Sequence, residues 1–502
     1  MLCSYYALQV VLRTTLSSTA DLDEAEQALL AQNWSWGYGA QPPLYTWLQI
    51  GFFRVFGISI LAESLLKNFI LLSTCLLTAW SGRLVTGSLT GGVAAAAALF
   101  CLPQFAWESQ RDLTHSVLAS AMSAAVLLCF LKLCLPGRGS LRNAGEGENE
   151  AVDLAECYLP KRQSSVVWHL LLGLSVAAAL LAKHNTAFWI LGLFAAALTL
   201  PQARRIMLNR RMVLSCLVCG IVLAPYLLWV WRHPASAMES SSKLAMQAFV
   251  PWYAATWRGL TAVISGIAAF LGPLFGVFAL LSLKSRVKGW PDLTRNVGTN
   301  LLCRTFLATF ALLLVFVLLF HVTSFKSRWL QPLLISAPIL TVAILSPRLN
   351  RLRLNLLVGM AASVMVLVLI LFPGRLLTSG QRHKDERLAR PYPELTRQLT
   401  WVPQDALVVA DTKLLAGNLR LGLPEVPVIV PGAEPTPLPA RPHCFLVWDA
   451  SRDMTRSVPQ NLREWVKQRS RMDPTGATAR YISAPYKFGN TLRLRLGIVQ
   501  LY

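Results

Sequence analysis

Residues 21–47 read DLDEAEQALLAQNWSWGYGAQPPLYTW, and this acidic, aromatic and proline-ended stretch decides how the rest of the chain is interpreted. It follows an apolar N-terminus and contains no Lys or Arg, but it has four carboxylates: Asp21, Asp23, Glu24 and Glu26. Such carboxylates must be solvated, matched by cations from elsewhere, or chemically employed. The alternative is an acidic cap on a short helix, because acids before a helical run satisfy free N–H groups and suit the helix dipole.

The second half of the stretch indicates a membrane surface. Trp34, Trp36 and Tyr38 are aromatic residues of the kind that settle at the bilayer interface. Pro42 and Pro43 are expected to stop the helix that begins at the acids and to redirect the chain. We therefore expect an acidic outer loop over residues 17–55.

Composition is typical of a polytopic membrane protein. The mean hydropathy is +0.47, and 54% of the 502 residues are hydrophobic but only 14% are charged, against about 25% charged in soluble domains. The formal net charge is +22. Because the basic residues lie mostly in short loops between apolar runs, this charge indicates contact with anionic membrane lipids and argues against nucleic acid as a partner.

Apolar runs predict an all-α membrane domain with about eleven transmembrane helices. Loops such as the one with Arg210 and Arg211 hold an excess of basic residues, which places the N-terminus in the cytoplasm and the outer loop in the periplasm. The first run carries Arg13 near its outer end and is short, so we expect its start to be truncated or misassigned. The runs are residues 1–16, 65–85, 89–102, 113–133, 166–182, 185–200, 212–231, 259–283, 304–323, 329–346 and 352–372.

A change of composition near residue 373 predicts two domains, a membrane domain over 1–372 and a small extracytoplasmic α/β domain over 373–502. A helix is expected at 462–466. Residues 137–163 are polar and glycine-rich and read as a flexible cytoplasmic loop. The predicted strands are 406–410, 426–430, 444–448, 480–482 and 492–501.

The first-loop motifs resemble those of glycosyltransferase family 39. These motifs are Asp23-Glu24 after the first apolar run, then Gly37-Tyr38, and then Pro42-Pro43-Leu44 with Trp47. The family includes dolichyl-phosphate-mannose protein mannosyltransferases, aminoarabinose transferases of lipid A and galacturonosyltransferases of lipopolysaccharide core. The resemblance, over roughly residues 1–350, implies the GT-C fold, a multi-pass inner-membrane enzyme and a polyprenyl-phosphate sugar as donor. It does not specify the sugar, or whether the acceptor is a lipid, a glycan or a protein.

The resemblance also assigns site residues. It implies a second functional acid at Asp112, inside a segment of unusual charge density that otherwise reads as an interfacial anchor. Asp23 is expected to be the general base, with Glu24 and Asp112 positioning donor or acceptor. Motif and neighbouring residues expected to line the substrate cavity are Asp21, Tyr38, Pro42, Pro43, Arg111, His115, His321 and Trp329.

Cations are expected to bind the donor phosphate. Lys183 lies in a tight turn where family members carry a lysine, although a snorkelling lysine is the alternative. Lys326 and Arg328 resemble the basic motif that enters a late span of the family, and Arg holds phosphate oxygens by a bidentate fork. Aminoarabinose transferases have a basic residue where this sequence has Gln41, so the phosphate contact is expected to come from Arg13, Lys183, Lys326 and Arg328.

The implied reaction is an inverting displacement in which polyprenyl phosphate leaves as an anion. Two other classes stay open. A transporter or flippase of a lipid-linked sugar needs polar groups along a path through the membrane, whereas here they gather at one face. A membrane phosphotransferase would need a metal; a divalent cation on Glu24 and a His is possible, but no strong metal-ligand spacing is present.

Overall fold

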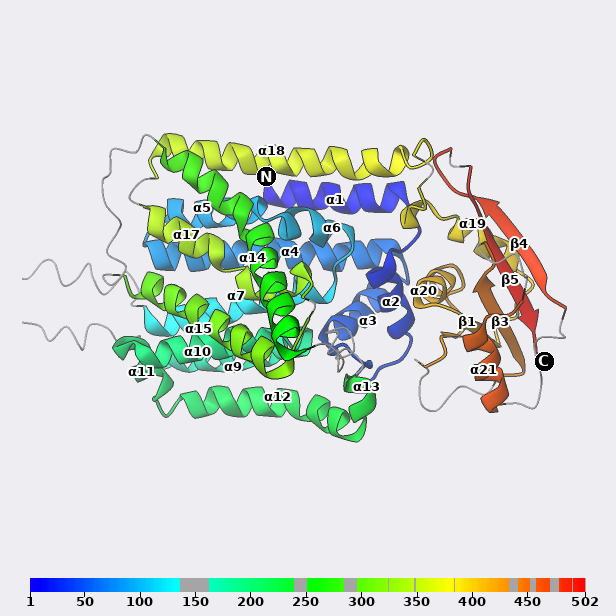
Figure 1. The fold of residues 1–502 in the computed structure, drawn as a ribbon, viewed down its shortest axis with the longest axis horizontal. Coiled ribbons are helices and arrows are strands. Elements are labelled where there is room, and N and C mark those ends of the chain that lie inside the picture. Colours follow the sequence, from blue (N-terminus) through cyan, green and yellow to red (C-terminus); the bar gives the residue numbers. More distant parts are fainter. Residues whose placement is uncertain are drawn as a thin grey trace, which may run out of the picture.

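The computed structural model describes residues 1–135, 162–238, 251–283, 296–323, 325–346, 349–382, 384–432, 441–451, 457–469, 478–489 and 491–501. The predicted loop at 137–163 falls almost wholly outside these ranges. In Figure 1 the apolar helices run side by side, and the C-terminal domain lies at one end of them.

Among the described residues, seven helices are long and apolar enough to cross a membrane. Polar side chains start several of them: Ser59, Asn296 and Asn350 each accept a hydrogen bond from a backbone N–H of the first turn. The seven are α4 (Ile60–Thr86), α7 (His115–Cys134), α9 (Arg162–Ala182), α12 (Met212–Arg232), α14 (Trp252–Ser282), α15 (Val297–Phe320) and α18 (Arg351–Leu377).

Two further spans are bent. The segment formed by α5 (Leu89–Ala98) and η1 (Leu99–Cys101) meets η2 (Gln104–Glu108) and α6 (Ser109–Arg111) at 77°, and α10 (Thr186–Thr199) meets α11 (Pro201–Met207) at 117°. The remaining apolar runs form α1 (Leu2–Leu16), α16 (Gln331–Leu334) and α17 (Ala337–Leu345). Every predicted apolar run is thus helical, and the all-α membrane class is confirmed.

The outer loop forms α2 (Leu22–Leu30) and α3 (Leu44–Phe56). The expectation that Pro42 and Pro43 stop the acidic helix is wrong, because α2 already ends at Leu30. Instead Pro43 caps the start of α3, where its fixed φ and missing N–H are tolerated.

The C-terminal domain contains a five-stranded mixed sheet in the order β2-β1-β3-β5-β4. β1 pairs in parallel with β2 and β3, and β5 pairs antiparallel with β3 and β4. The strands are β1 (Ala406–Ala410), β2 (Val428–Ile429), β3 (His443–Asp449), β4 (Arg480–Pro485) and β5 (Arg493–Gln500), and the helices are α19 (Tyr392–Thr396), α20 (Lys413–Gly422) and α21 (Gln460–Arg469). The predicted strands and α21 are confirmed, but α20 was not predicted.

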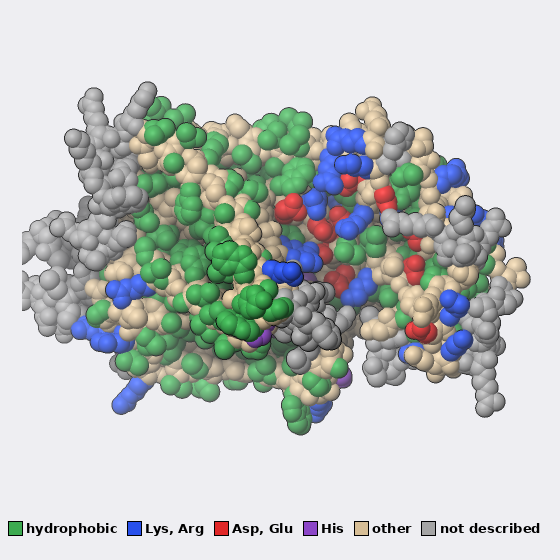
Figure 2. All heavy atoms as spheres, in the orientation of Figure 1, with side chains coloured by type: hydrophobic (Ala, Val, Ile, Leu, Met, Phe, Trp, Pro, Cys, Tyr) green, Lys and Arg blue, Asp and Glu red, His purple; other side chains and the backbone are tan. Residues whose placement is uncertain are grey.

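The membrane helices and the C-terminal domain share one hydrophobic core. α18 continues through Pro373, and its Phe372 and Leu376 pack with Leu29 of α2 and with the apolar residues of the sheet. Figure 2 shows Asp and Glu side chains of the described residues gathered at this junction, among Lys and Arg. Acidic and basic side chains of the described residues therefore meet between the membrane helices and the C-terminal domain.

Candidate active site at the membrane–domain junction

α2 begins with a reciprocal cap that uses two of its four carboxylates. The Asp21 side chain accepts the backbone N–H groups of the first turn, and the Glu24 carboxylate accepts the N–H of Asp21 at 3.0 Å. Asp21 also pairs with Arg387 at 2.9 Å. The capping interpretation of the acids is therefore correct for these two residues, which counts against a substrate contact by Asp21.

Glu24 lies between two buried cations. Its carboxylate contacts Arg13 at 2.6 Å and Lys67 at 3.0 Å, and all three side chains are almost fully buried. Burial by itself would raise the pKa of Glu24, but the positive charges of Arg13 and Lys67 outweigh it and hold the pKa well below its usual range. Arg13 donates further to the carbonyls of Ser17 and Thr19 at 2.7 Å. These bonds commit Arg13 and Glu24 to each other, not to a donor phosphate or an acceptor.

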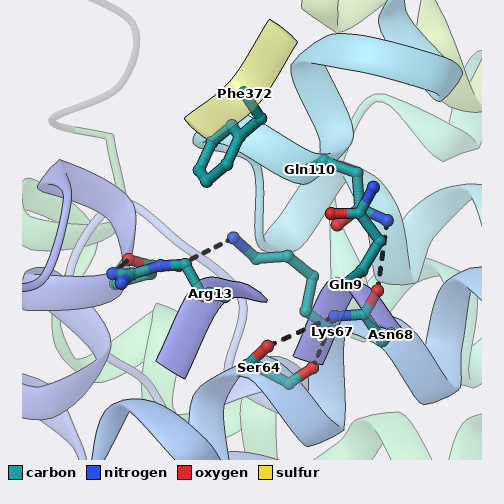
Figure 3. Close-up of a pocket in the computed structure, with 8 residues that line it drawn as sticks. Gln9, Arg13, Ser64, Lys67, Asn68, Gln110 and Phe372 are labelled. Atoms are coloured by element: carbon teal, nitrogen blue, oxygen red, sulfur yellow. Dashed lines mark hydrogen bonds and ion pairs between the residues drawn. The ribbon is translucent and has the colours of Figure 1, made fainter. Parts of the chain in front are cut away.

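Polar residues around this ion pair line a small cavity, drawn in Figure 3. The amide of Gln110 donates to Asn68 at 3.1 Å, and Asn68 in turn donates to Ser64. The cavity volume is about 10 Å³, close to what one water molecule needs. It is a structural pocket, too small for a sugar.

Sequence reasoning missed two charged residues of α4. Lys67 and Glu63 are each 2% exposed, and neither carboxylate oxygen of Glu63 has a hydrogen-bond partner among the described residues. The available signal was their position: ionisable residues within an apolar span are costly and indicate a specific partner. The apolar run that predicts this span begins at residue 65. Glu63 therefore lies before the predicted span, and Lys67 lies inside it.

Asp23 points in a different direction from Glu24 and lies near Asp112. The backbone N–H of Asp23 donates to the Asp112 carboxylate. Burial, followed by the negative charge of Asp112, raises the pKa of Asp23 to about 7. Burial also raises the pKa of Asp112. Two partly buried carboxylates this close cannot both ionise easily, so one of them holds a proton near neutral pH.

The segment that carries Asp112 has an unusual backbone. η2 is a π-helical turn, a rare conformation that often occurs at functional sites. Ser109 at its end accepts a hydrogen bond from Gln331 at 2.9 Å, which ties this segment to α16. The bend after η1 and the π-helical turn together bring Asp112 to the N-terminal half of α2.

Two of the predicted cations lie within electrostatic reach of Asp23: Arg328 and Lys183. Lys183 donates to Ser116 at 2.6 Å, and burial, with help from the charge of Arg328, lowers its pKa to about 7. Arg328 lies in η4 (Ser327–Trp329), which Asn185 holds by a bond to the Trp329 carbonyl. Lys326 precedes η4 and is exposed, so it is accessible to a ligand from solvent.

His115 joins a buried amide network rather than an open cavity. Its Nε2 lies 3.1 Å from the Gln27 amide, and Thr46 donates to the same amide at 2.9 Å. Gln27 is one helical turn after Asp23, so this network fixes the face of α2 that carries the acid.

Several predicted cavity residues have other roles. The Tyr38 hydroxyl donates to the Asn33 carbonyl at 2.8 Å and closes its own loop, and Arg111 pairs with Glu108 at 3.5 Å. His321 ends α15 in the left-handed region, with φ 48°, and is exposed. Pro42 and Pro43 are buried at the start of α3. The contacts of Tyr38 and Arg111 and the burial of Pro42 and Pro43 favour a structural role for these four residues.

No group of three or more His, Cys, Asp or Glu side chains is arranged to hold a metal ion within the described ranges. Asp23 and Asp112 lie close to each other, but the positive side chains of Arg328 and Lys183 lie near this pair. The predicted divalent cation therefore has no assigned ligand set in this part of the chain.

Two proteins of known name share sequence with the chain along nearly its whole length. Lipopolysaccharide core galacturonosyltransferase RgtB of Rhizobium johnstonii is 29% identical over 499 residues, which cover 97% of this chain and 94% of that protein. Lipopolysaccharide core galacturonosyltransferase RgtA of the same organism is 29% identical over 469 residues, covering 91% and 87%. No protein-family model matches.

The fold has a solved counterpart as well. The crystal structure of ArnT from Cupriavidus metallidurans bound to undecaprenyl phosphate superposes with a TM-score of 0.61 at 12% identity, covering 99% of this chain and 97% of that one. The chain therefore has the fold of ArnT, and its two named relatives are glycosyltransferases. The predicted GT-C fold and the resemblance that led to it are confirmed.

This GT-C site combines the groups that a glycosyl transfer needs. Asp23, with a pKa near 7, can accept a proton at neutral pH, as a general base must. Lys183 and Arg328 supply positive charge on the same side, where an anionic leaving group can be stabilised. Asp112 keeps the proton affinity of Asp23 high.

Proposed function

We propose that this multi-pass membrane glycosyltransferase transfers a galacturonosyl residue from a polyprenyl-phosphate donor to the core of lipopolysaccharide. The class of reaction follows from the two relatives, which are named as glycosyltransferases. The sugar and the acceptor are our inference from RgtA and RgtB, whose names give both and which align with almost the whole chain. The placement of Asp23 beside Asp112, Lys183 and Arg328 is the observation that carries the proposed chemistry.

In the proposed step, an acceptor hydroxyl attacks the anomeric carbon of the donor while the bond from that carbon to the phosphate oxygen breaks. The hydroxyl proton passes to the Asp23 carboxylate, and the electron pair of the broken bond leaves with polyprenyl phosphate. General-base assistance of this kind contributes about 10² to 10⁴-fold. A single displacement inverts the anomeric centre.

The leaving phosphate would be held by Arg328, Lys183 and Lys326. Arg328 offers two N–H donors in a fixed fork, and the two lysines act as point charges. The bound lipid in the ArnT structure is undecaprenyl phosphate, which makes that lipid phosphate the first ligand to test here. We place this site on the periplasmic face of the inner membrane, because the basic loops lie at the opposite end of the helices.

The test is transfer by the purified protein in lipid. Undecaprenyl-phosphate galacturonic acid is offered with deacylated or intact lipopolysaccharide core, and undecaprenyl-phosphate aminoarabinose and glucose serve as competing donors. We expect labelled core only with the galacturonic acid donor, and a loss of at least about 100-fold in kcat for Asp23→Asn. Glu108→Gln, which removes a carboxyl from the neighbouring segment without touching the pair, is the matched control.

Four outcomes would contradict parts of this proposal. Transfer of another sugar would refute the donor, and transfer to protein would refute the acceptor. Tight donor binding without turnover would favour a lipid-linked sugar transporter. Full activity of Asp23→Asn would leave the enzyme class intact and remove Asp23 as the base.

A further inference from the structure

We propose that the C-terminal domain is a positioning part of the active site: α20 fixes α2, with Gly417 and Asn418 as positioning residues for Asp23. This inference rests on the proposed function only in taking Asp23 as the reactive acid. It concerns how that acid is held and assigns the domain a role in catalysis beyond any choice of acceptor.

α2 cannot hold its place by itself. It is a nine-residue helix, and isolated helices shorter than about 12 to 15 residues are marginal in water. Its position must therefore come from the elements packed around it. Residues three or four apart share a face of a helix, so α2 presents distinct faces to distinct neighbours.

One face of α2 packs against the membrane helices. Glu24 is bound by Arg13 and Lys67, and Ala28 packs with Phe53 of α3 and Ala62 of α4. These contacts and the bond between Gln27 and His115 hold α2 against the membrane helices. The remaining support of α2 comes from the C-terminal domain.

The neighbouring face of α2, which carries Ala25, packs directly on α20. A Cβ atom added to Gly417 would overlap the carbonyl oxygen of Ala25, so the two helix backbones touch. Such a backbone contact cannot be relieved by rotating a side chain. Any side chain at residue 417 must move α2 relative to α20.

Hydrogen bonds fix the start of α2 to the same domain. Asn418, which is 3% exposed, accepts the N–H of Ala20 at 2.8 Å and donates to the carbonyl of Ala20 at 3.2 Å. Ser17 donates to the carbonyl of Leu388 at 2.7 Å, and Thr19 donates to that of Arg390 at 2.8 Å. The residues just before Asp23 are therefore held by the C-terminal domain.

The far end of α2 and its charges are held as well. The side chain of Gln32 makes two bonds to the backbone of Val428, at 2.8 and 3.0 Å. Glu26 pairs with Lys413 at the start of α20, at 2.7 Å. Asp23 lies on a third face of α2, between the membrane helices and the C-terminal domain. This face is directed toward Asp112 and Arg328. Its closeness to Asp112 thus depends on the seating of α2 on α20.

The first experiment compares Gly417→Ala with Gly359→Ala in the full chain reconstituted in lipid. Gly359 lies in α18, and a Cβ there meets nothing within 4 Å, so it controls for the helix propensity of alanine. We expect Gly417→Ala to lower kcat by at least about tenfold with an unchanged KM for the donor, since a misplaced group can cost up to about 10²-fold. The acid limb of its pH–rate profile should also move to lower pH. The shift in α2 takes Asp23 away from the negative charge of Asp112, so the pKa of Asp23 falls. Unchanged kcat and an unchanged limb would overturn the proposal.

A charge reversal provides a second, independent test that does not depend on packing. Lys413→Glu alone should lower kcat, and Glu26→Lys in the same chain should restore at least part of the loss. No restoration, in chains that elute and melt as the wild type does, would overturn the proposal. If Gly417→Ala fails to fold, this pair of variants decides.

Hydrogen exchange of the α2 amides separates this inference from the proposed function. Faster exchange over residues 22–30 in Gly417→Ala but not in Gly359→Ala supports positioning by the domain, even if the wild type transfers none of the donors offered. Failure of transfer by the wild type refutes only the proposed reaction. Equal exchange in both variants refutes only the positioning.

Discussion

Replacing Asp112 by Asn should move the acid limb of the pH–rate profile to lower pH. In the wild type, burial first and the charge of Asp112 second raise the pKa of Asp23 from 3.8 to about 7. Asn keeps the oxygen that accepts the Asp23 N–H but carries no charge. A neighbouring like charge changes a carboxyl pKa by about 1 or more, so we expect the pKa of Asp23 to fall by about 1.

The sign follows from the role of Asp23 as a base, which is active when ionised. With a pKa of 7, about 9% of Asp23 is ionised at pH 6 and about 50% at pH 7; a pKa lower by 1 gives about 50% and about 91%. The rate at pH 6 relative to pH 7 should therefore rise about threefold in Asp112→Asn. Lys183 is present in both variants, so the comparison is made between ratios and not between absolute rates.

The assay is kcat/KM for labelled undecaprenyl-phosphate sugar between pH 5 and 8, because this ratio reports the free enzyme. Glu108→Gln is the control, and it should keep the wild-type profile although it removes a carboxyl near Asp112. A ratio that stays at the wild-type value in Asp112→Asn would refute charge coupling between the two acids. A loss of kcat/KM at every pH, as large as that expected for Asp23→Asn, would mean that Asp112 is the base.

Three further predictions concern the cations. Lys183→Arg should move the alkaline limb of the pH–rate profile above pH 9. Burial and the charge of Arg328 lower the pKa of Lys183 to about 7, whereas an arginine stays protonated. An alkaline limb that stays near pH 7 would show that another group titrates there. Lys67→Met should destabilise the protein by about 3–5 kcal/mol, because Glu24 then keeps only one of its two cations. The measurement is thermal unfolding in detergent. The double variant with Glu24→Gln should lose less stability than the two single variants lose together. Arg328→Ala should weaken binding of undecaprenyl phosphate by about 1.5–3 kcal/mol, measured by calorimetry in detergent, with a smaller loss in Arg328→Lys; equal binding would remove Arg328 from the phosphate site.

The sequence predicted the parts of the fold that depend on local pattern. Apolar runs bounded by polar residues gave all the membrane helices, and short β-branched runs gave the strands. α20 was not predicted because Gly417 interrupts a short amphipathic segment, although Leu415 and Leu419 have helical spacing. Glycine lowers helix propensity but is needed at this backbone contact.

The acids of α2 show what a sequence alone leaves open. Capping and catalysis were alternatives for the whole group, but the helix turns by about 100° per residue, so neighbouring acids face different partners. Glu24 turns toward Arg13 and Lys67, whereas Asp23 turns toward Asp112. Separating these roles requires the position of Lys67, which belongs to another helix and depends on tertiary packing.

The bond between Ala20 and Asn418 also has a consequence for biosynthesis, because these residues are 398 positions apart in the chain. At about 5–20 residues per second, the ribosome finishes the support of α2 about 20 to 80 s after making α2 itself. During that interval the membrane helices can already bind lipid, but the acid helix lacks its second support. If Asp23 acts as proposed, chains that stop before residue 418 should not transfer sugar.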